Sequence, residues 1–342
     1  MKTKHMILAV VAAALFSVLP HAIAQQSDYT GIPTNLPGVT TSIAPPSGFN
    51  PLTASDSELA TYGFPPRPDQ KVSASAYATW ERAMKASNQR VFPVLELTNH
   101  FNGSNASAGK ITNSTGYSYN WSGMVDTTTA TSYGPTSFNN VFAVYVVPIA
   151  QQAFGACTGG WDYSSSWVGI DGWSSGDVLQ AGTESDAYCS GGTKSTYYSA
   201  WYEWFPFAEV RISSLPVYPG DTIYVGVWST SSTQGNAYLA NFNTNQYVFV
   251  SFSAPAGTHL VGNSAEWVVE RPGIGGGLAT LTNYISDMFA DGYAWTVAGT
   301  PYDPGSSGAI QVTMADNYGN PISYPSLLGP SGIWFQDEGS AW

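Results

Sequence analysis

Residues 218–228 read Tyr-Pro-Gly-Asp-Thr-Ile-Tyr-Val-Gly-Val-Trp, a turn sequence followed at once by β-branched and aromatic residues. Pro and Gly end one element, and the run that begins at Thr222 favours a strand. Similar short runs, bounded by Gly, Pro, Asn or Asp, recur along the rest of the chain at 141–147, 201–205, 247–252 and 266–270. Regularly spaced short strands predict an all-β domain, built as a β-sandwich or a barrel.

The first 24 residues have the pattern of a secretory signal peptide. Lys2 and Lys4 precede an apolar run, and Ala22-Ile23-Ala24 closes it. We therefore expect a secreted, extracellular protein, with the periplasm as the alternative. The apolar run is shorter than the ~20 residues of a membrane-spanning helix, and no later stretch approaches that length, so no membrane partner is expected.

Residues 25–110 differ in composition from the remainder and are interpreted as an N-terminal extension that could serve as a propeptide. The stretch 25–66 is rich in Pro, Ser, Thr and Gly and predicts an extended or disordered lead-in. Residues 73–90 are compatible with one amphipathic helix, and 99–115 are loop-like. The main domain is placed at 111–342.

Charge is unevenly distributed along the chain. Of the 342 residues, 23 are acidic and 11 basic. From residue 111 onward the chain has 17 acidic residues but only three basic ones, Lys194, Arg211 and Arg271. Nucleic acid is thereby excluded as a partner, because phosphate binding needs clustered cations. At low pH, protonation of the carboxylates would leave few charges to repel one another, so the composition suits acid surroundings.

Few chemistries remain once the motifs are examined. Only His100 and His259 follow the predicted signal peptide, and the sequence has no metal-binding, P-loop or dinucleotide motif, so neither metal nor cofactor is expected. Residues 172–176 match a nucleophile-elbow pattern, but no helix is expected after them, so we interpret them as a turn. Cys157 and Cys189 are interpreted as one disulfide, as expected for an even pair in an exported protein.

Carboxylates, amides and aromatic side chains are left as candidate functional groups. Because side chains alternate along a strand, Glu203 shares a face with Trp201, and Glu266 shares a face with Val268. Gln180 lies on another predicted strand and could stand opposite Glu266 if the two strands are close.

Several blocks of sequence resemble the eqolisin, or glutamic peptidase, family. They occur in the family's order and extend the similarity from about Asn120 to the C terminus. The blocks are Tyr-Asn-Trp-Ser-Gly (119–123), Trp-Val-Gly-Ile-Asp-Gly (167–172), Val-Leu-Gln-Ala-Gly (178–182), Ala-Trp-Tyr-Glu-Trp-Phe-Pro (200–206) and Ala-Glu-Trp-Val-Val-Glu (265–270). Residues 310–314 and 325–327 resemble the last strands of the family.

This resemblance implies an antiparallel sandwich of two packed sheets, similar to concanavalin A and other lectins, preceded here by an extension with one helix. It also implies an acid-active endopeptidase, in which Gln180 and Glu266 match the catalytic pair. The positions that match residues lining or supporting the family's site are Trp167, Asp171, Glu184, Trp201 and Glu203. Glu184 stands where fungal members often have Asp, and the stretch after Gln180 is longer than theirs.

The resemblance implies polypeptide substrates, no cofactor and no metal, and we expect a monomer. Two alternatives stay open at this stage. A carbohydrate-binding or glycoside-cleaving sandwich would use Glu203 and Glu266 as paired carboxylates. A surface adhesin would keep the fold and bind without turnover.

Overall fold

The computed structural model describes residues 31–102, 115–153, 157 and 159–338. The predicted signal peptide (1–24) and the predicted domain boundary near Lys110 lie outside the described residues, so both remain predictions. Among the described helices, none combines the length and the hydropathy that crossing a membrane requires.

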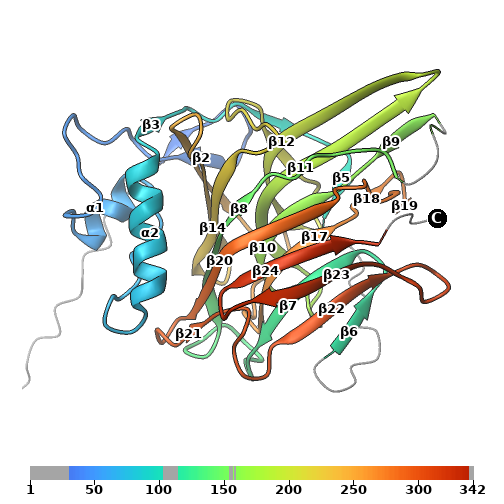
Figure 1. The fold of residues 1–342 in the computed structure, drawn as a ribbon. Helices are drawn as coiled ribbons and strands as arrows, with labels where there is room; N and C mark the ends of the chain where they lie inside the picture. The colour runs from blue at the N-terminus through green and yellow to red at the C-terminus, as the bar shows by residue number, and fades with distance from the viewer. Residues whose placement is uncertain (1–30, 103–114, 154–156, 158, 339–342) are drawn as a thin grey trace, which may run out of the picture. The chain divides into compact units, whose positions relative to one another are not determined.

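One layer of the fold is an antiparallel sheet in the order β16–β15–β14–β8–β20, here called the outer sheet (Figure 1). The runs predicted at 141–147, 222–228 and 247–252 lie in three of its strands, which confirms them. The outer sheet consists of β8 (Phe138–Val146), β14 (Thr222–Ser231), β15 (Gln234–Asn241), β16 (Gln246–Ser253) and β20 (Ser286–Thr296).

The second layer, here called the inner sheet, has the order β7–β17–β10–β11–β12–β13, with β9 paired to the far end of β11. It contains the predicted runs 201–205 and 266–270. Its strands are β7 (Trp121–Thr127), β9 (Gly160–Asp162), β10 (Ser165–Ile170), β11 (Val178–Ser190), β12 (Thr193–Phe205), β13 (Val210–Ile212) and β17 (Ser264–Glu270). The nucleophile-elbow pattern at 172–176 runs into β11 rather than a helix, so its interpretation as a turn is confirmed.

The C-terminal strands connect the two layers along one side through the pairings β20–β24–β23–β22–β7. The predicted last strands, 310–314 and 325–327, lie within β22 and β23. This part consists of β6 (Thr115–Ser118), β21 (Pro301–Tyr302), β22 (Ile310–Ala315), β23 (Pro321–Leu328) and β24 (Gly332–Asp337). Among the described strands the ladder does not close on itself, so the fold is a sandwich and not a barrel.

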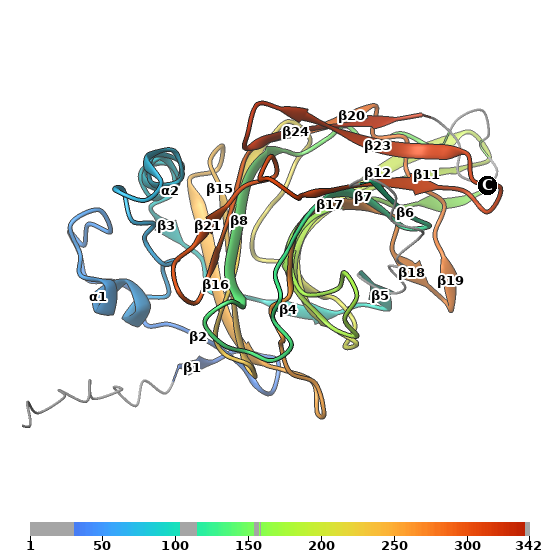
Figure 2. The same cartoon turned by 90° about the horizontal axis from the view of Figure 1, so that it is seen from below.

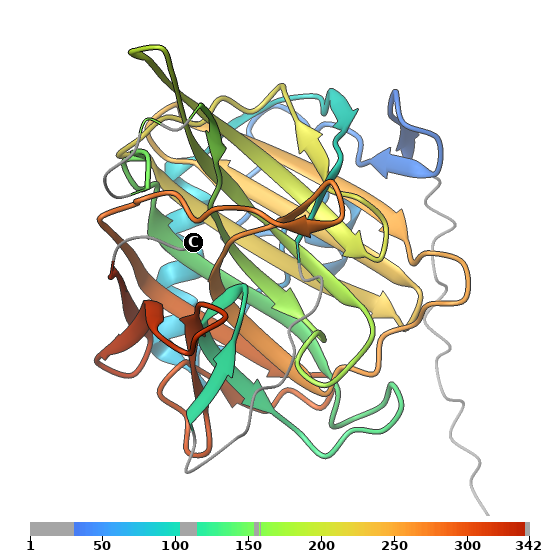
Figure 3. The same cartoon turned by 90° about the vertical axis from the view of Figure 1, so that its right-hand side faces the viewer.

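The main core lies between the two sheets and follows from the alternation of side chains along the strands. In β17, Trp267 and Val269 point into this core, whereas Val268 belongs to a separate cluster on the other face of the inner sheet. Figures 2 and 3 show the layers from two further directions, with the helices on the far side of the outer sheet.

The N-terminal extension is ordered within its described part, 31–102. The predicted helix at 73–90 is confirmed as α2 (Ala74–Ala86), but the prediction for 25–66 is wrong for the described residues, because they contain a second helix, α1 (Asp56–Thr61), and two short strands. Ser55 and Glu58 form a reciprocal capping box at the start of α1. The extension strands are β1 (Ile32–Pro33), β2 (Val39–Thr41), β3 (Gln89–Arg90), β4 (Leu95–Leu97) and β5 (His100–Phe101).

Strand β5 leaves the extension to form a small sheet with β18 (Gly273–Ile274) and β19 (Gly277–Leu278). The predicted disulfide is also confirmed, since Cys157 and Cys189 are bonded. It attaches the end of β11 to the segment before β9.

Candidate active site

Gln180 and Glu266 lie in one row of residues across neighbouring strands of the inner sheet. Gly169 of β10 pairs with Gln180 of β11 on one side and with Glu266 of β17 on the other. Residues paired directly across strands point to the same face, so both side chains face away from the main core. Two strand spacings of about 4.8 Å separate their backbones by roughly 10 Å. Gly169 carries no side chain, and the Trp167 ring and the Val178 side chain pack directly over it, since a methyl group there would meet them at 2.8 and 3.1 Å.

The polar atoms of this predicted pair are buried and largely unpartnered. Glu266 is fully buried, and neither carboxylate oxygen has a hydrogen-bond partner in the described part of the chain. Burial raises the pKa of Glu266 well above its usual value, and the negative charges of Asp171 and Asp126 add to the shift. Gln180 donates from Nε2 to a backbone carbonyl, while its Oε1 has no partner among the described residues.

That backbone carbonyl belongs to Asn102, the last described residue of the extension. Its oxygen lies 2.9 Å from Gln180 Nε2, and its backbone N–H donates to Glu203 Oε2 at 2.9 Å. The Asn102 side chain donates to Glu209 Oε2 at 3.0 Å. The main chain of the extension therefore occupies the space in front of Gln180.

Glu203 extends the same row by one strand, since it pairs with Gln180 across β11 and β12. It is buried, and burial raises its pKa well above the usual value, although the N–H of Asn102 opposes that shift. Glu209, in the loop before β13, has a raised pKa for the same reason, with the nearby Glu184 adding repulsion. Glu203 thus supports the segment that faces Gln180.

Glu184 lies further along β11, on the same face, and contacts the extension through His100. His100 Nδ1 is 2.5 Å from Glu184 Oε1, while Ser199 Oγ donates to the other oxygen at 3.2 Å. A cavity of about 250 Å³ opens beside His100, lined also by Tyr163, Asp186, Tyr197, Arg211 and Trp161.

The ligand atoms of His100, Glu184 and Glu209 lie within 4.8 Å of one another, which raises the question of a metal site. Two ligands that share a zinc ion at about 2.0–2.2 Å stand roughly 3 Å or more apart. The 2.5 Å separation between His100 Nδ1 and Glu184 Oε1 is a hydrogen-bond distance instead. We therefore describe this contact as a hydrogen bond between the extension and the inner sheet.

Trp167 and Trp201 form the row beside the predicted pair, on either side of Gly182. Both indoles are fully buried, and Trp167 Nε1 donates to Glu270 Oε2 at 2.9 Å. A methyl group on Gly169 would meet the Trp167 ring at 2.8 Å, so this ring packs directly against Gly169. The two tryptophans thus form the floor next to Gln180 and Glu266.

Asp171 binds the backbone of the loop that precedes β17. It follows β10 with a positive φ of 67°, and its carboxylate accepts the N–H groups of Val261, Gly262 and Asn263 at 2.7–2.9 Å. That loop leads directly into β17, the strand of Glu266. Asp171 therefore fixes where β17 begins and does not itself lie in the row of the predicted pair.

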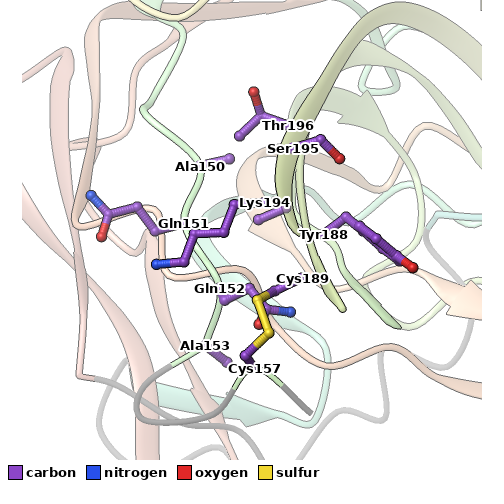
Figure 4. Close-up of a pocket in the computed structure, with 11 residues that line it drawn as sticks. Ala150, Gln151, Gln152, Ala153, Cys157, Tyr188, Cys189, Lys194, Ser195 and Thr196 are labelled. Atoms are coloured by element: carbon purple, nitrogen blue, oxygen red, sulfur yellow. A yellow bond between two sulfur atoms is a disulfide. The ribbon is translucent and has the colours of Figure 1, made fainter. Parts of the chain in front are cut away.

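The disulfide lies apart from this row. Figure 4 shows Cys157 and Cys189 lining a surface pocket of about 800 Å³ together with Lys194. Neither Gln180 nor Glu266 lines this pocket. The disulfide therefore stabilises the end of the β11–β12 hairpin and not the predicted pair.

The strand order also bears on the paired-carboxylate alternative. Glu203 and Glu266 are three strands apart, about 14 Å between backbones, with Gln180 and Gly169 between them. The neighbour of Glu203 in this row is therefore the Gln180 amide and not the carboxyl group of Glu266, which favours the amide and carboxylate pair over paired carboxylates.

Three residues at this site were not identified from the sequence: His100, Asn102 and Glu209. The first two lie at the start of a stretch interpreted as loop, and no local pattern indicates that they contact the inner sheet. The only available signal was that His100 is one of two histidines after the signal peptide.

Comparisons with known proteins agree with this geometry. The model of the Peptidase A4 family matches residues 119–326. Aspergillopepsin-2 of Aspergillus niger is 30% identical over 227 residues, covering 63% of this chain and 76% of that protein. Scytalidopepsin B of Scytalidium lignicola is 35% identical over 138 residues, covering 40% of this chain and 47% of that protein.

Solved structures give the same result. Scytalido-glutamic peptidase bound to a peptide-based transition-state analogue aligns with a TM-score of 0.51 and 26% identity, over 64% of this chain and 98% of that chain. A second structure of that enzyme, with a transition-state analogue inhibitor, aligns with a TM-score of 0.52. The resemblance in the sequence blocks, the sandwich fold and the enzyme class are thereby confirmed. The chain belongs to the Peptidase A4 (eqolisin) family of glutamic peptidases.

Proposed function

We propose that the protein is a secreted, acid-active endopeptidase in which Glu266 and Gln180 hydrolyse peptide bonds through one water molecule. The observation that carries the proposal is that both residues stand opposite Gly169 on one face, with a peptide carbonyl already bound to Gln180. The substrates would be polypeptides, as the peptide-based inhibitor bound to scytalido-glutamic peptidase suggests.

Glu266 would act as the general base and then as the general acid. Its ionised carboxylate takes a proton from the water as the water oxygen attacks the scissile carbonyl carbon. The same carboxyl group then gives that proton to the departing amine when the C–N bond breaks. Both of its oxygens lack a partner in the described residues, which supports a role in binding water and substrate.

Gln180 would stabilise the tetrahedral intermediate. Its amide cannot titrate, so it offers a permanent N–H donor to the developing oxyanion. The 2.9 Å contact between Gln180 Nε2 and Asn102 O marks where a substrate carbonyl would be held. A neutral amide also avoids the like-charge repulsion that two ionised carboxylates would suffer.

Acid activity requires Glu266 to ionise at low pH, which becomes possible only once water reaches its buried carboxyl group. Burial raises its pKa, and opening of the cleft would move the pKa back toward its ordinary value, which lies in the acid range. The scarcity of cations after residue 110 suits stability in acid as well. Secretion is proposed from the signal-peptide pattern of residues 1–24.

The remaining predicted site residues would position this pair. Trp167 and Trp201 would form the floor beside the pair. Glu203 would hold the main chain that is bound in front of Gln180, and Glu184 would bind side chains further along β11. Asp171 would orient β17. We further propose that the extension (25–110) is a propeptide segment of the catalytic domain (111–342), because its Asn102 occupies the position in front of Gln180 that a substrate would need.

The test is cleavage of an acid-denatured protein by the purified, acid-treated chain, with a polysaccharide as the second substrate. Glu266→Gln and Gln180→Ala should each lower the rate of peptide cleavage by at least about 100-fold, since oxyanion donors alone contribute that much. Glu96→Gln and Gln151→Ala are matched controls at exposed positions and should cleave as the wild type does. Full activity in either site variant, or turnover of polysaccharide only, would refute the proposal.

A further inference from the structure

The face of the outer sheet that points away from the main core is aromatic. Outer faces of antiparallel sheets normally meet water and carry polar residues. Here eight buried aromatic side chains lie on that face, at most 7% exposed. They are Phe142, Tyr224, Trp228, Tyr238, Tyr247, Phe249, Tyr293 and Trp295, and all belong to one hydrophobic cluster.

The helices of the extension cover this face (Figure 2). Phe64, just after α1, lies with its ring centroid 5.4 Å from Tyr247 and 6.1 Å from Tyr238. Trp80 of α2 is fully buried in the same cluster. The contact is chiefly apolar, with one ion pair between Arg82 and Asp291 at 2.7 Å at its margin.

The extension also completes the edges of both sheets. Strands β2 and β3 pair with β16 at the edge of the outer sheet, and β4 pairs with β13 at the edge of the inner sheet. Uncovered edge strands present rows of unpaired N–H and C=O groups that invite aggregation. Departure of the extension would leave both edges open.

The exposed area would also be large. Each aromatic side chain buries roughly 150–250 Å², and uncovering a third of eight such side chains would already reach the roughly 300–600 Å² of the largest apolar patch on a typical monomer. Acid does not weaken such contacts, because apolar burial does not depend on the charge of carboxylates.

The segment in the cleft is attached differently. His100 and Asn102 are held by hydrogen bonds to Gln180, Glu184, Glu203 and Glu209, together with the short pairing of β5 with β18. Polar contacts of this kind exchange with water and with a competing peptide at small net cost. The two parts of the extension can therefore behave independently.

The family match begins at residue 119, and 64% of this chain accounts for 98% of the chain of scytalido-glutamic peptidase. The helices and strands of residues 31–98, which cover the outer sheet, thus lie outside the region that matches the family. We propose that residues 31–98 stay bound to the sandwich in the active peptidase as a permanent layer, and that activation displaces only the segment around 100–102. The second part of this statement rests on the proposed function.

The experiment follows the full chain through acid treatment by native and denaturing mass spectrometry, alongside activity. We expect the active species to contain residues 31–98, either in one uncut chain or as a fragment that remains non-covalently bound. A soluble, active species that begins near residue 115 and lacks residues 31–98 would overturn the proposal.

The retention can be measured without the chain's own activity. Glu266→Gln protein, cut in the same way by a small amount of added pepsin, should retain residues 31–98 equally. This arm separates a failure of the proposed catalysis from a failure of retention, because it does not require Glu266.

A variant pair tests the cause of retention. Trp80→Ala removes the buried side chain of α2, and we expect it to lose most of the bound extension after cutting, whereas Val72→Ala, at a half-exposed position of the extension, should retain it. Equal retention in both would show that the aromatic contact does not hold the layer.

Discussion

Gln180 and Glu266 flank Gly169, the one residue between them in their row of the inner sheet. The glycine matters because the Trp167 ring and Val178 pack directly against it, and a side chain there would displace them beside the predicted pair. A methyl group would also meet the Trp167 ring at 2.8 Å and Val178 at 3.1 Å, contacts too short to accept without movement.

We predict that Gly169→Ala lowers kcat/KM for peptide cleavage by about 100-fold or more, since small displacements of catalytic groups have effects of this size. A loss of stability of about 1–3 kcal/mol is expected as well, because the buried Trp167 ring and Val178 must move to admit the methyl group. Gly277→Ala is the matched control, as a methyl group there meets nothing within 4 Å. Unchanged cleavage by Gly169→Ala would show that the absence of a side chain at this position is not needed for catalysis.

A second prediction concerns the contact between His100 and Glu184. His100→Ala removes the 2.5 Å hydrogen bond to Glu184 that holds the extension against the inner sheet. Hydrogen bonds to charged groups contribute about 1.5–3 kcal/mol, so the cleft should become available roughly 10- to 100-fold more readily. In a progress curve started without acid pre-treatment, the lag before cleavage should shorten by a corresponding factor.

Lys71→Ala, which changes an exposed cation of the extension, is the control for that experiment and should keep the wild-type lag. An unaltered lag in His100→Ala would mean that the segment is held by its other contacts alone.

A third prediction concerns stability against pH. Burial raises the pKa of Asp126 to about 8, with the charge of Asp303 adding to it, and burial raises the pKa of Asp287 to about 7. The folded chain therefore binds more protons than the unfolded chain between about pH 4 and pH 8. The free energy of unfolding should fall as pH rises through this interval.

Urea unfolding at pH 4 and pH 8 measures this slope, and Asp126→Asn should reduce it because an amide cannot titrate. A wild-type chain more stable at pH 8 than at pH 4 would contradict the direction. An identical slope in Asp126→Asn would remove Asp126 as its source.

The sandwich could be predicted because strand periodicity is local. Alternation along 201–205 and 266–270 places Glu203 and Glu266 on defined faces without knowledge of the rest of the chain. Which strands are neighbours is a property of the whole topology. The sequence blocks resembled those of a family, and only that resemblance linked Gln180 to Glu266 before the strand order was known.

The parts that sequence reasoning missed depend on contacts between distant residues. The capping box of Ser55 and Glu58 was a readable signal for α1, but it was hidden in a stretch rich in Pro and Gly. Asn102 contributes its backbone carbonyl to the site, and no side-chain pattern marks such a role. The cover of α1 and α2 over the outer sheet was likewise invisible, since aromatic residues on both faces of a strand do not reveal what lies above them.

The central claim is that Gln180 and Glu266 work on one water molecule as a unit. A double-mutant cycle tests it most directly, by measuring kcat/KM for Glu266→Gln, Gln180→Ala and the two together on one peptide substrate. Residues that act as a unit are strongly non-additive, so the double variant should be about as slow as the slower single variant. If the two losses instead multiply, the residues act independently and the shared mechanism is wrong.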